Sequence, residues 1–277
     1  MAQASNTGVA FHDAFYKFVH LPATVEVASA LRDITAPLLG SILVAHEGIN
    51  GMLAGSAEAL DAFRHTLATD PRFGGHFADM VYKRSPCITQ PFKRMKVHEK
   101  AEIVPLGIAG IDAAKQTGIN VSPEDWRKLI DQEDVLLIDN RNSFEFRLGQ
   151  FRNAINPEVT NFRDFPEYVL ANIDGWKAEG KKVAMYCTGG IRCEKTSAWM
   201  LDLGMTVYQL EGGILNYFEK MPDAEKDWQG ECFVFDNRIA LDTHLQETPT
   251  TLDDVYGSDS EDDAWRLKRA RLLDSSN

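Results

Sequence analysis

The chain of 277 residues has little cysteine and no long apolar run. Four cysteines are too few for a disulfide framework in a protein of this length, so they need another explanation. No stretch approaches the roughly 18 consecutive apolar residues of a transmembrane helix. The first twenty residues also lack the basic and then apolar order of a secretory signal. We therefore expect a soluble, cytoplasmic, reduced protein that does not have a membrane as a partner.

Positive charge is scarce as well. The chain has 29 Lys and Arg residues against 41 Asp and Glu residues, a formal net charge of −12. This balance argues against nonspecific adhesion to nucleic acid and against DNA as a partner. The deficit is uneven, because residues 1–105 contain ten basic and ten acidic side chains and the whole of the −12 falls in residues 106–277. A local basic region in the first part can therefore still contact RNA.

The first part of the chain alternates strand and helix patterns. The order is strand, helix, two strands, helix and two further strands, at 14–20, 23–34, 41–45, 52–54, 56–67, 77–83 and 95–104. The Asn50-Gly51 pair predicts a hairpin turn before the third strand, and Ser56 is placed to cap the second helix. The order β-α-β-β-α-β is typical of a ferredoxin-like (acylphosphatase-like) α+β domain. We expect this domain at 12–105, after a loose N-terminus at 1–11.

The second part predicts a parallel α/β domain. Three short apolar runs are typical of strands buried on both faces, at 135–138, 183–186 and 207–210. Helical segments at 165–177 and 193–203 lie between them, and Ser122 followed by Pro123 marks an earlier helix start. We expect the domain at 122–222, after a linker at 106–121. A C-terminal extension at 223–246, with a strand at 232–235, and a polar charged tail at 247–277 complete the chain.

One loop of this second domain has the composition of a reactive site. The apolar strand at 183–186 leads into Cys187, and Gly189, Gly190 and Arg192 follow before a helix begins. The glycines let successive backbone N–H groups turn inward as an anion nest, and the helix N-terminus adds partial positive charge. Such surroundings stabilise a thiolate and make Cys187 a candidate nucleophile. The alternative is a buried core cysteine, which the glycine and arginine context disfavours.

The other members of the candidate site lie in the same loop and near the preceding strand. The loop members are Thr188, Gly189, Gly190, Ile191, Arg192 and Cys193, and the supporting members are Asp139, Arg141 and Glu145. Without the loop, Asp139 and Arg141 are more commonly a structural ion pair than catalytic residues. Cys193 is compatible with three roles: it resolves an oxidised Cys187 as a disulfide, it caps the helix, or it packs beneath the loop.

These segments together resemble the rhodanese domain, over about residues 122–220. The motifs, in order, are Asp139-Asn-Arg141, Glu145, Gly149-Gln-Phe151, Asn153-Ala-Ile-Asn156-Pro157, the Cys187 loop and a closing strand at Leu210-Glu-Gly-Gly-Ile214. The resemblance implies a rhodanese-like parallel α/β fold. Sulfurtransferases of this type have Cys-x4-Arg, whereas the related dual-specificity phosphatases have Cys-x5-Arg. Cys187 and Arg192 match the shorter loop, so a phosphatase is disfavoured and a persulfide carrier stays open.

The whole chain, over about residues 12–240, resembles the rhodanese-domain tRNA uridine hydroxylase family (TrhO). The segments that carry this resemblance are Tyr16-Lys-Phe-Val, Ala45-His-Glu-Gly-Ile-Asn-Gly51, Pro91-Phe-Lys-Arg-Met-Lys-Val97, Cys187 to Lys195, Gln209 to Tyr217 and Gly230 to Asp236. The resemblance implies hydroxylation at C5 of the wobble uridine of tRNA to give 5-hydroxyuridine. It assigns the nucleophile to Cys187, molecular oxygen as co-substrate and no bound cofactor, and it leaves the reductant open.

The residues suggest how such a reaction proceeds. A thiolate that adds to C6 of uracil makes C5 electron-rich, and loop N–H groups with Arg192 can stabilise the negative charge that develops. The seven histidines are scattered, so neither a metal site nor an iron-dependent hydroxylase is expected. Two alternatives remain: a sulfurtransferase that carries a persulfide on Cys187, and a binding module without catalysis.

A basic stretch of the first domain is the candidate RNA-binding region. Its members are Lys83, Arg84, Lys93, Arg94 and Lys96, with Tyr82 and Phe92 among them. Cations that neutralise phosphates, next to aromatic rings that stack on bases, are typical of single-stranded RNA contacts. The alternative is an ordinary solvated strand face. Together with the resemblance, this pattern predicts tRNA as the partner.

Overall fold

A computed structural model describes residues 10–257 and 260–275. The chain divides into two compact units, residues 1–103 and residues 104–277. The first nine residues, most of the loose N-terminus expected at 1–11, lie outside the described part. Residues 10 and 11 already belong to a strand, because they pair with its neighbours.

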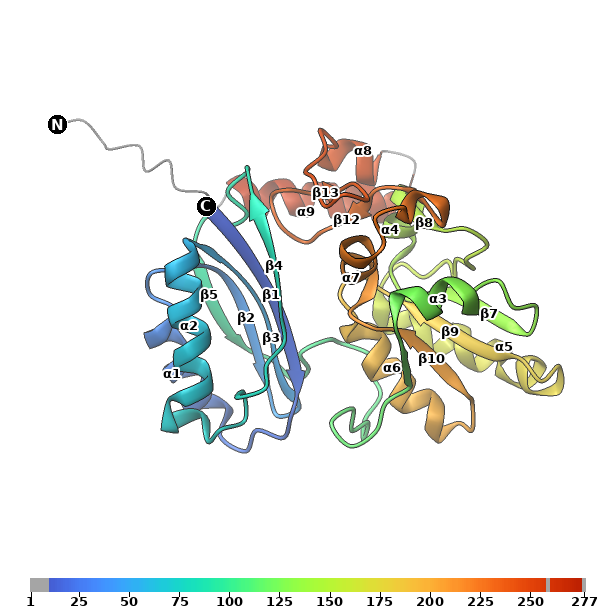
Figure 1. Ribbon diagram of the computed structural model, residues 1–277, viewed down its shortest axis with the longest axis horizontal. Coiled ribbons are helices and arrows are strands. Elements are labelled where there is room, and N and C mark those ends of the chain that lie inside the picture. The colour runs from blue at the N-terminus through green and yellow to red at the C-terminus, as the bar shows by residue number, and fades with distance from the viewer. Residues whose placement is uncertain (1–9, 258–259, 276–277) are drawn as a thin grey trace. The chain divides into compact units, whose positions relative to one another are not determined.

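The first unit is a five-stranded sheet in the order β4-β1-β3-β2-β5. Its strands are β1 (Ala10–Phe18), β2 (Leu39–Ala45), β3 (Gly48–Gly55), β4 (Tyr82–Cys87) and β5 (Met95–Glu99). Two helices, α1 (Thr24–Ile34) and α2 (Ala57–Thr69), cover one face of the sheet (Figure 1). Neighbouring strands are antiparallel, except that β5 runs parallel to β2 at the edge. The predicted ferredoxin-like order is confirmed, and the strand predicted at 95–104 is β5, which ends earlier, at Glu99.

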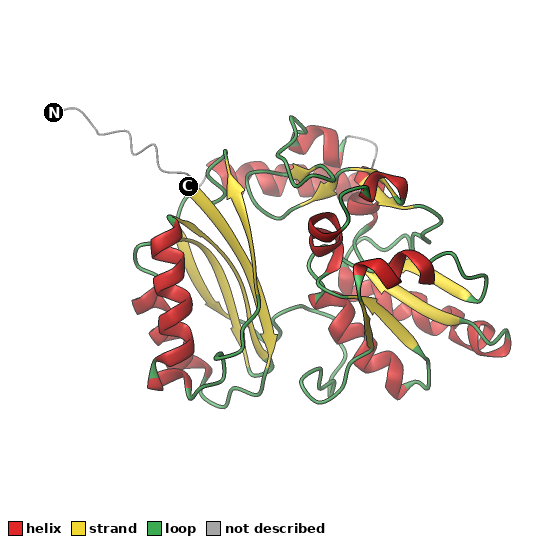
Figure 2. Ribbon diagram, in the orientation of Figure 1, coloured by secondary structure: helices red, strands yellow, loops and turns green. Residues whose placement is uncertain are grey.

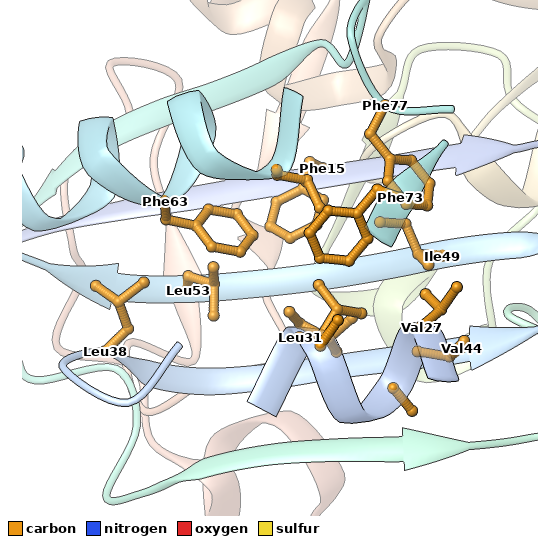
Figure 3. Close-up of a cluster of buried hydrophobic side chains, with 14 of the residues drawn as sticks. Phe15, Val27, Leu31, Leu38, Val44, Ile49, Leu53, Phe63, Phe73 and Phe77 are labelled. Carbon is orange, nitrogen blue, oxygen red and sulfur yellow. The ribbon is translucent and has the colours of Figure 1, made fainter. Parts of the chain in front are cut away.

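The core of this unit lies between the two helices and the sheet. Alternate residues of β1 and β3 point to the helices, and Phe15, Ile49 and Leu53 are buried there. Figure 3 shows these side chains against Leu31 and Phe63, which the helical spacing brings to the inner faces of α1 and α2. Burial of each such side chain contributes about 1.5–3 kcal/mol.

The hairpin between β2 and β3 turns at a different place from the one predicted. Ala45 pairs with Gly48, so the turn is formed by His46 and Glu47. Gly51 lies inside β3, where an added Cβ would be 2.3 Å from the ring of Phe15. The glycine therefore permits close packing of an aromatic ring and does not form a turn. The strand predicted at 77–83 starts too early as well, because β4 begins at Tyr82.

The second unit is built on a four-stranded parallel sheet in the order β6-β10-β9-β7. The strands are β6 (Ile119–Val121), β7 (Val135–Asp139), β9 (Lys182–Tyr186) and β10 (Val207–Leu210), and Figure 2 shows them among helices. The helices are α3 (Pro123–Leu129), α4 (Ser143–Leu148), α5 (Phe165–Ala178), α6 (Ile191–Asp202) and α7 (Gly213–Lys220). Four consecutive residues of β9, at 183–186, are fully buried, so both faces of the sheet are covered as predicted.

Strand β6 corrects the predicted linker at 106–121. Its three residues pair with β10 at the edge of the sheet, so the end of that segment belongs to the domain. Leu106 and Ala113 are buried as well. Edge strands are short and need few apolar residues, which explains why the sequence pattern did not reveal this one.

The C-terminal region is more structured than the expected polar tail. Strand β11 (Trp228–Gly230) pairs with β8 (Gly149–Phe151), and β12 (Cys232–Phe233) pairs with β13 (Ala240–Leu241). Helices α8 (Leu252–Tyr256) and α9 (Glu261–Ser275) follow within the predicted tail. Val255 and Tyr256 join Phe144 of α4 and Phe233 in a small core of their own. No helix in the described ranges is long and apolar enough to cross a membrane.

Candidate active site

The loop after β9 holds Cys187 at the carboxyl end of the parallel sheet. Gly190 ends the loop in a left-handed conformation, with φ at 103°, that a residue with a side chain rarely adopts. Its N–H donates to the Sγ of Cys187 at 3.1 Å. Helix α6 begins at Ile191, two residues before the predicted start, so its positive N-terminus lies directly behind the thiol.

A second segment supports the loop from behind. The N–H groups of Ile214 and Leu215 donate to the carbonyl oxygens of Cys187 and Thr188 at 3.0 and 3.2 Å. An added Cβ on Gly213 would be 2.5 and 2.7 Å from the same two oxygens. The Gly-Gly-Ile motif, expected as part of a closing strand, is instead the start of α7 after β10 has ended at Leu210. Gly213 is what allows the two backbones to approach.

The surroundings of Cys187 favour its ionised form. Burial is the largest effect on this thiol and opposes ionisation, since the residue is 1% exposed. Hydrogen bonds from the thiol and N–H of Cys193, the charge of Arg192 and the Gly190 N–H together outweigh burial. They hold the pKa of Cys187 well below its usual range. This direction favours the thiolate, the nucleophilic form of cysteine.

Cys193, in the first turn of α6, is the neutral partner of this thiolate. Burial, and then its hydrogen bond to Cys187, raise the pKa of Cys193 well above the usual range. Asn140 also contacts it, with Nδ2 3.9 Å from its Sγ and 3.0 Å from Thr196 Oγ1. Sequence reasoning missed Asn140, although its position directly after β7, between two charged residues, was a signal. Of the three roles left open for Cys193, the contacts in the structure correspond to packing beneath the loop.

Arg192 is held by a buried carboxylate from another element. Its Nη1 and Nη2 lie 2.7 and 2.8 Å from the two carboxylate oxygens of Glu145 on α4. Both side chains are nearly or fully buried. The Asn142 N–H donates to Glu145 at 3.1 Å and closes a capping box at the start of α4. Despite burial, Arg192 holds the pKa of Glu145 below its usual range. The pair fixes the arginine against the loop.

Asp139 and Arg141 form a second ion pair, which has other partners. Arg141 Nε lies 2.9 Å from Asp139 Oδ1, and Nη2 lies 2.6 Å from Oδ2 and from the carbonyl oxygen of Gly149. Both side chains are fully buried, and the guanidinium lies 5.3 Å from the ring centroid of Trp228. These contacts join the end of β7 to β8 and β11. The contacts of Asp139 and Arg141 are therefore those of a structural ion pair.

The structure divides the predicted RNA-binding residues between two edges of the first sheet. Lys83 and Arg84 lie on β4, Lys93 and Arg94 come just before β5, and Lys96 lies on β5. Arg84 forms ion pairs with Asp13 and Asp61, in which its Nε and Nη1 each lie 2.8 Å from a carboxylate oxygen. Lys83 lies 5.9 Å from the ring centroid of Tyr16. The residues adjacent in sequence therefore do not form one continuous patch.

The β5 edge collects further positive charge that the sequence did not reveal. Lys96 and His98 lie on one side of the strand, Lys100 follows directly after its last residue, and Arg32 of α1 reaches the same edge, where its Nη2 donates to the Val97 carbonyl at 3.3 Å. Burial, and then the charges of Lys100, Lys96, Arg32 and Arg94, lower the pKa of His98. We name Arg32, Arg94, Lys96, His98 and Lys100 the basic edge. Arg32 was missed because it lies more than sixty positions before the others.

The described residues contain no group of three His, Cys, Asp or Glu side chains that could hold a metal ion.

Comparison with protein families agrees with the two units. Residues 12–103 match the model of the UPF0176 acylphosphatase like domain, and residues 122–220 match the rhodanese-like domain. Fold and site thus define a rhodanese-type protein with an acylphosphatase-like N-terminal domain. A curated relative, the tRNA uridine(34) hydroxylase of Legionella pneumophila (strain Corby), is 42% identical over 253 residues, which cover 88% of this chain and 94% of the relative. The chain belongs to the tRNA uridine(34) hydroxylase family.

Two solved structures are similar to parts of the chain. A rhodanese-related protein from Thermoplasma volcanium is 24% identical, with a TM-score of 0.29, over 37% of this chain and 93% of that chain. An acylphosphatase from Coxiella burnetii is 11% identical, with a TM-score of 0.24, over 35% of this chain and all of the other.

Proposed function

We propose that the protein is an oxidoreductase that hydroxylates C5 of uridine 34, the wobble base of tRNA, to give 5-hydroxyuridine, with Cys187 as nucleophile. The observation that carries the proposal is the buried Cys187 sulfur, which accepts the Gly190 N–H at 3.1 Å just before helix α6, with Arg192 in the first turn of that helix. The curated relative is named for a hydroxylation of the same uridine. Because a tRNA substrate is met in the cytoplasm, the predicted cytoplasmic location stays part of this proposal.

The thiolate supplies covalent activation of the base. Its sulfur adds to C6 of the uracil ring, and the electron pair of the C5–C6 double bond moves onto C5 and the O4 oxygen. N–H groups of the loop stabilise this enolate-like charge in a water-poor site. After oxygen has been transferred to C5, loss of the C5 proton and departure of the Cys187 thiolate restore the double bond. Since Cys187 is 1% exposed, a local opening of the loop has to precede any reaction of its sulfur.

The electron balance of the reaction requires a reductant as well as an oxygen donor. If molecular oxygen supplies the hydroxyl group, one oxygen atom enters the base and the other leaves as water. Two electrons and two protons are then needed from a reductant. We propose oxygen as co-substrate with no resident cofactor, and the reductant is an external molecule of a class still to be found.

The basic edge supports tRNA as the partner. Lys96 and His98 lie on one side of β5, about 6.6 Å apart along the strand, and Lys100 follows directly after its last residue, Glu99. Such a row can follow successive phosphates of an RNA backbone, with Lys93 and Arg94 beside it. Lys83 and Arg84 are kept as proposed RNA contacts from the sequence, although Arg84 has its two aspartate partners already.

A sulfurtransferase is the second candidate, because the Cys-x4-Arg loop has the length found in persulfide carriers. In that reaction Cys187 attacks a sulfane sulfur, keeps it as a persulfide and releases the remaining thiol or sulfite. The two candidates differ in their product. The hydroxylase leaves oxygen on the tRNA, and the transferase leaves sulfur on the protein.

Nucleoside mass spectrometry of tRNA tests both. We expect 5-hydroxyuridine to be absent from a strain that lacks the gene and to return with the wild-type gene but not with Cys187→Ser. Full return with Cys187→Ser would contradict the proposed role of the thiolate. Loss of a thiolated nucleoside, with 5-hydroxyuridine unchanged, would favour the sulfurtransferase.

A further inference from the structure

Phe235 is an exposed aromatic ring beside the reactive loop. Among the described residues, Phe235 and Trp265 are the Phe, Tyr and Trp side chains that are exposed, at 50% and 54%. The residues just before Phe235 behave differently, since Phe233 and Val234 are 3% and 4% exposed. Single exposed apolar side chains are common on protein surfaces, so the position of this ring, and not its exposure alone, carries the argument.

The ring of Phe235 is held in place by its neighbours. It stands edge-on to the ring of Phe233, at 5.0 Å between centroids and an interplanar angle of 88°. The chain then turns back, with the Val234 N–H donating to the Ile239 carbonyl at 2.8 Å. Two hydrogen bonds, at 2.7 and 2.8 Å, join Arg238 to Asp236, and both side chains are almost fully buried. The exposed ring of Phe235 therefore belongs to a turn whose conformation is held by these hydrogen bonds.

The position of Phe235 connects it to the reaction site. The guanidinium carbon of Arg192 lies 5.8 Å from the centre of the Phe235 ring. Arg192 is in the first turn of α6 and contacts Thr188 of the loop at 3.3 Å. A planar group that lies on the exposed ring is therefore a neighbour of the Cys187 loop.

We propose that Phe235 is the stacking platform for the uracil ring that reaches Cys187. The inference rests on the proposed function and adds a residue that positions and selects the substrate. A base that leaves its own stack loses its ring contacts, and an aromatic side chain at the site replaces them.

The competing role for Phe235 is to hold Arg192 through the cation–π contact. The two roles predict different effects at the thiol. If the ring acts through Arg192, its loss changes the pKa of Cys187. If it stacks with the base, its loss weakens the reaction with tRNA and leaves the pKa of Cys187 unchanged.

The test compares Phe235→Leu, which removes the aromatic face, with Phe235→Tyr, which keeps it. Each variant is expressed in a strain that lacks the gene, where the cell supplies the reductant, and 5-hydroxyuridine in its tRNA is measured by mass spectrometry after induction. We expect Phe235→Leu to lower the initial rate of 5-hydroxyuridine formation about tenfold to a hundredfold, and Phe235→Tyr to stay near wild type. Trp265→Leu is the matched control, because Trp265 is an equally exposed ring with an arginine, Arg269, 5.1 Å from its centroid on α9.

Two further measurements separate the outcomes. The pH dependence of Cys187 alkylation, without tRNA, should have the same midpoint in Phe235→Leu as in wild type, and a shifted midpoint would overturn the proposal in favour of the Arg192 role. Phe235→Trp should show fluorescence quenching by tRNA beyond that of the wild type, and no additional quenching would overturn stacking. If wild-type protein forms no 5-hydroxyuridine, the proposed function fails by itself. If wild type is active and Phe235→Leu is equally active, only this inference fails.

Discussion

Cys193 controls the charge of the nucleophile although it is itself neutral. Its thiol donates to Cys187, so it lowers the pKa of that residue against the opposing effect of burial. The free thiol of a cysteine titrates near about 8.5. Because the folded pKa lies well below that, Cys187 keeps its reactivity through neutral pH and loses it only as the pH falls through the folded pKa.

We therefore expect Cys193→Ala to raise the pKa of Cys187. The pH dependence of Cys187 alkylation, followed by peptide mass spectrometry, measures the shift as an upward move of the midpoint. Cys193→Ser retains a donor at the same position and should recover most of the wild-type profile. An identical midpoint in Cys193→Ala would show that the hydrogen bond does not determine the charge of Cys187.

Loss of the Glu145 carboxylate should lower the stability of the protein. Glu145→Gln leaves the buried Arg192 without its carboxylate, and breaking one partner of a buried ion pair costs about 3–5 kcal/mol. Urea denaturation should show this as a lower free energy of unfolding. Glu219→Gln is the control, because Glu219 is exposed and pairs loosely with Lys220 at 3.5 Å, so its effect should stay within about 0.5 kcal/mol.

Among the elements, α4 depends on the C-terminal helices. Its Phe144 packs against Tyr256 of α8 at 4.9 Å between ring centroids, and the guanidinium of Arg266 lies 5.0 Å from the same ring. Arg266 also donates to the Thr160 carbonyl and to Asn161. Because Glu145 follows Phe144 directly, the C-terminal region supports the element that holds Arg192.

Arg266→Ala should therefore lower the free energy of unfolding by about 1–2 kcal/mol, since it removes a cation–π contact and hydrogen bonds. Thermal or urea denaturation of the full chain measures it. Arg269→Ala, on the same helix, removes a guanidinium that lies over the exposed ring of Trp265, and it should change the free energy by less than about 0.5 kcal/mol. Equal losses of unfolding free energy in the two variants would mean that the contacts of Arg266 add nothing beyond the helix propensity of α9.

The basic edge makes its own prediction for RNA affinity. Lys96→Gln combined with Lys100→Gln should weaken tRNA binding and reduce the slope of log K against log salt by about 0.7–0.9 for each phosphate that is no longer neutralised. Filter binding at several salt concentrations gives the slope. Lys128→Gln, an exposed lysine of α3 in the other unit, is the control. An unchanged slope in the double variant would remove the basic edge from the RNA-binding surface.

The sequence predicts those elements whose pattern is local. Ser56 and Ser122 are recognisable as helix caps, and each accepts the expected backbone hydrogen bond, because a cap is decided within four residues. Gly51 was wrongly predicted to form a turn. Its missing side chain makes room for the ring of Phe15, which belongs to another strand. Strand β6 and helix α8 escaped prediction because their apolar partners lie far away in the chain.

At the scale of the whole molecule, the order of the two domains was predictable and the long-range contacts of the site were not. Cys187, the glycines and Arg192 are contiguous, so their chemistry could be read from one loop. The pairing of Arg192 with Glu145 joins residues 47 positions apart, and its geometry required the fold. Arg32 on the basic edge and Phe235 beside Arg192 are tertiary neighbours that no spacing rule connects to their sites.

Gly213 lies 26 positions after the nucleophile, yet it limits which sequences can keep the site. A methyl group there would meet the carbonyl oxygens of Cys187 and Thr188 at distances real atoms do not reach, and its φ of 70° disfavours a side chain as well. In a saturation mutagenesis screen scored by 5-hydroxyuridine, we expect this position to tolerate as few amino acids as Cys187 does. Purified Gly213→Ala should be less stable and alkylate differently at Cys187, whereas Gly180→Ala, with a similar φ of 66° but open space for a Cβ, serves as the control. A homologue without this glycine would need a different backbone at the start of α7. Evolution of the Cys187 loop is therefore coupled to the helix that packs behind it.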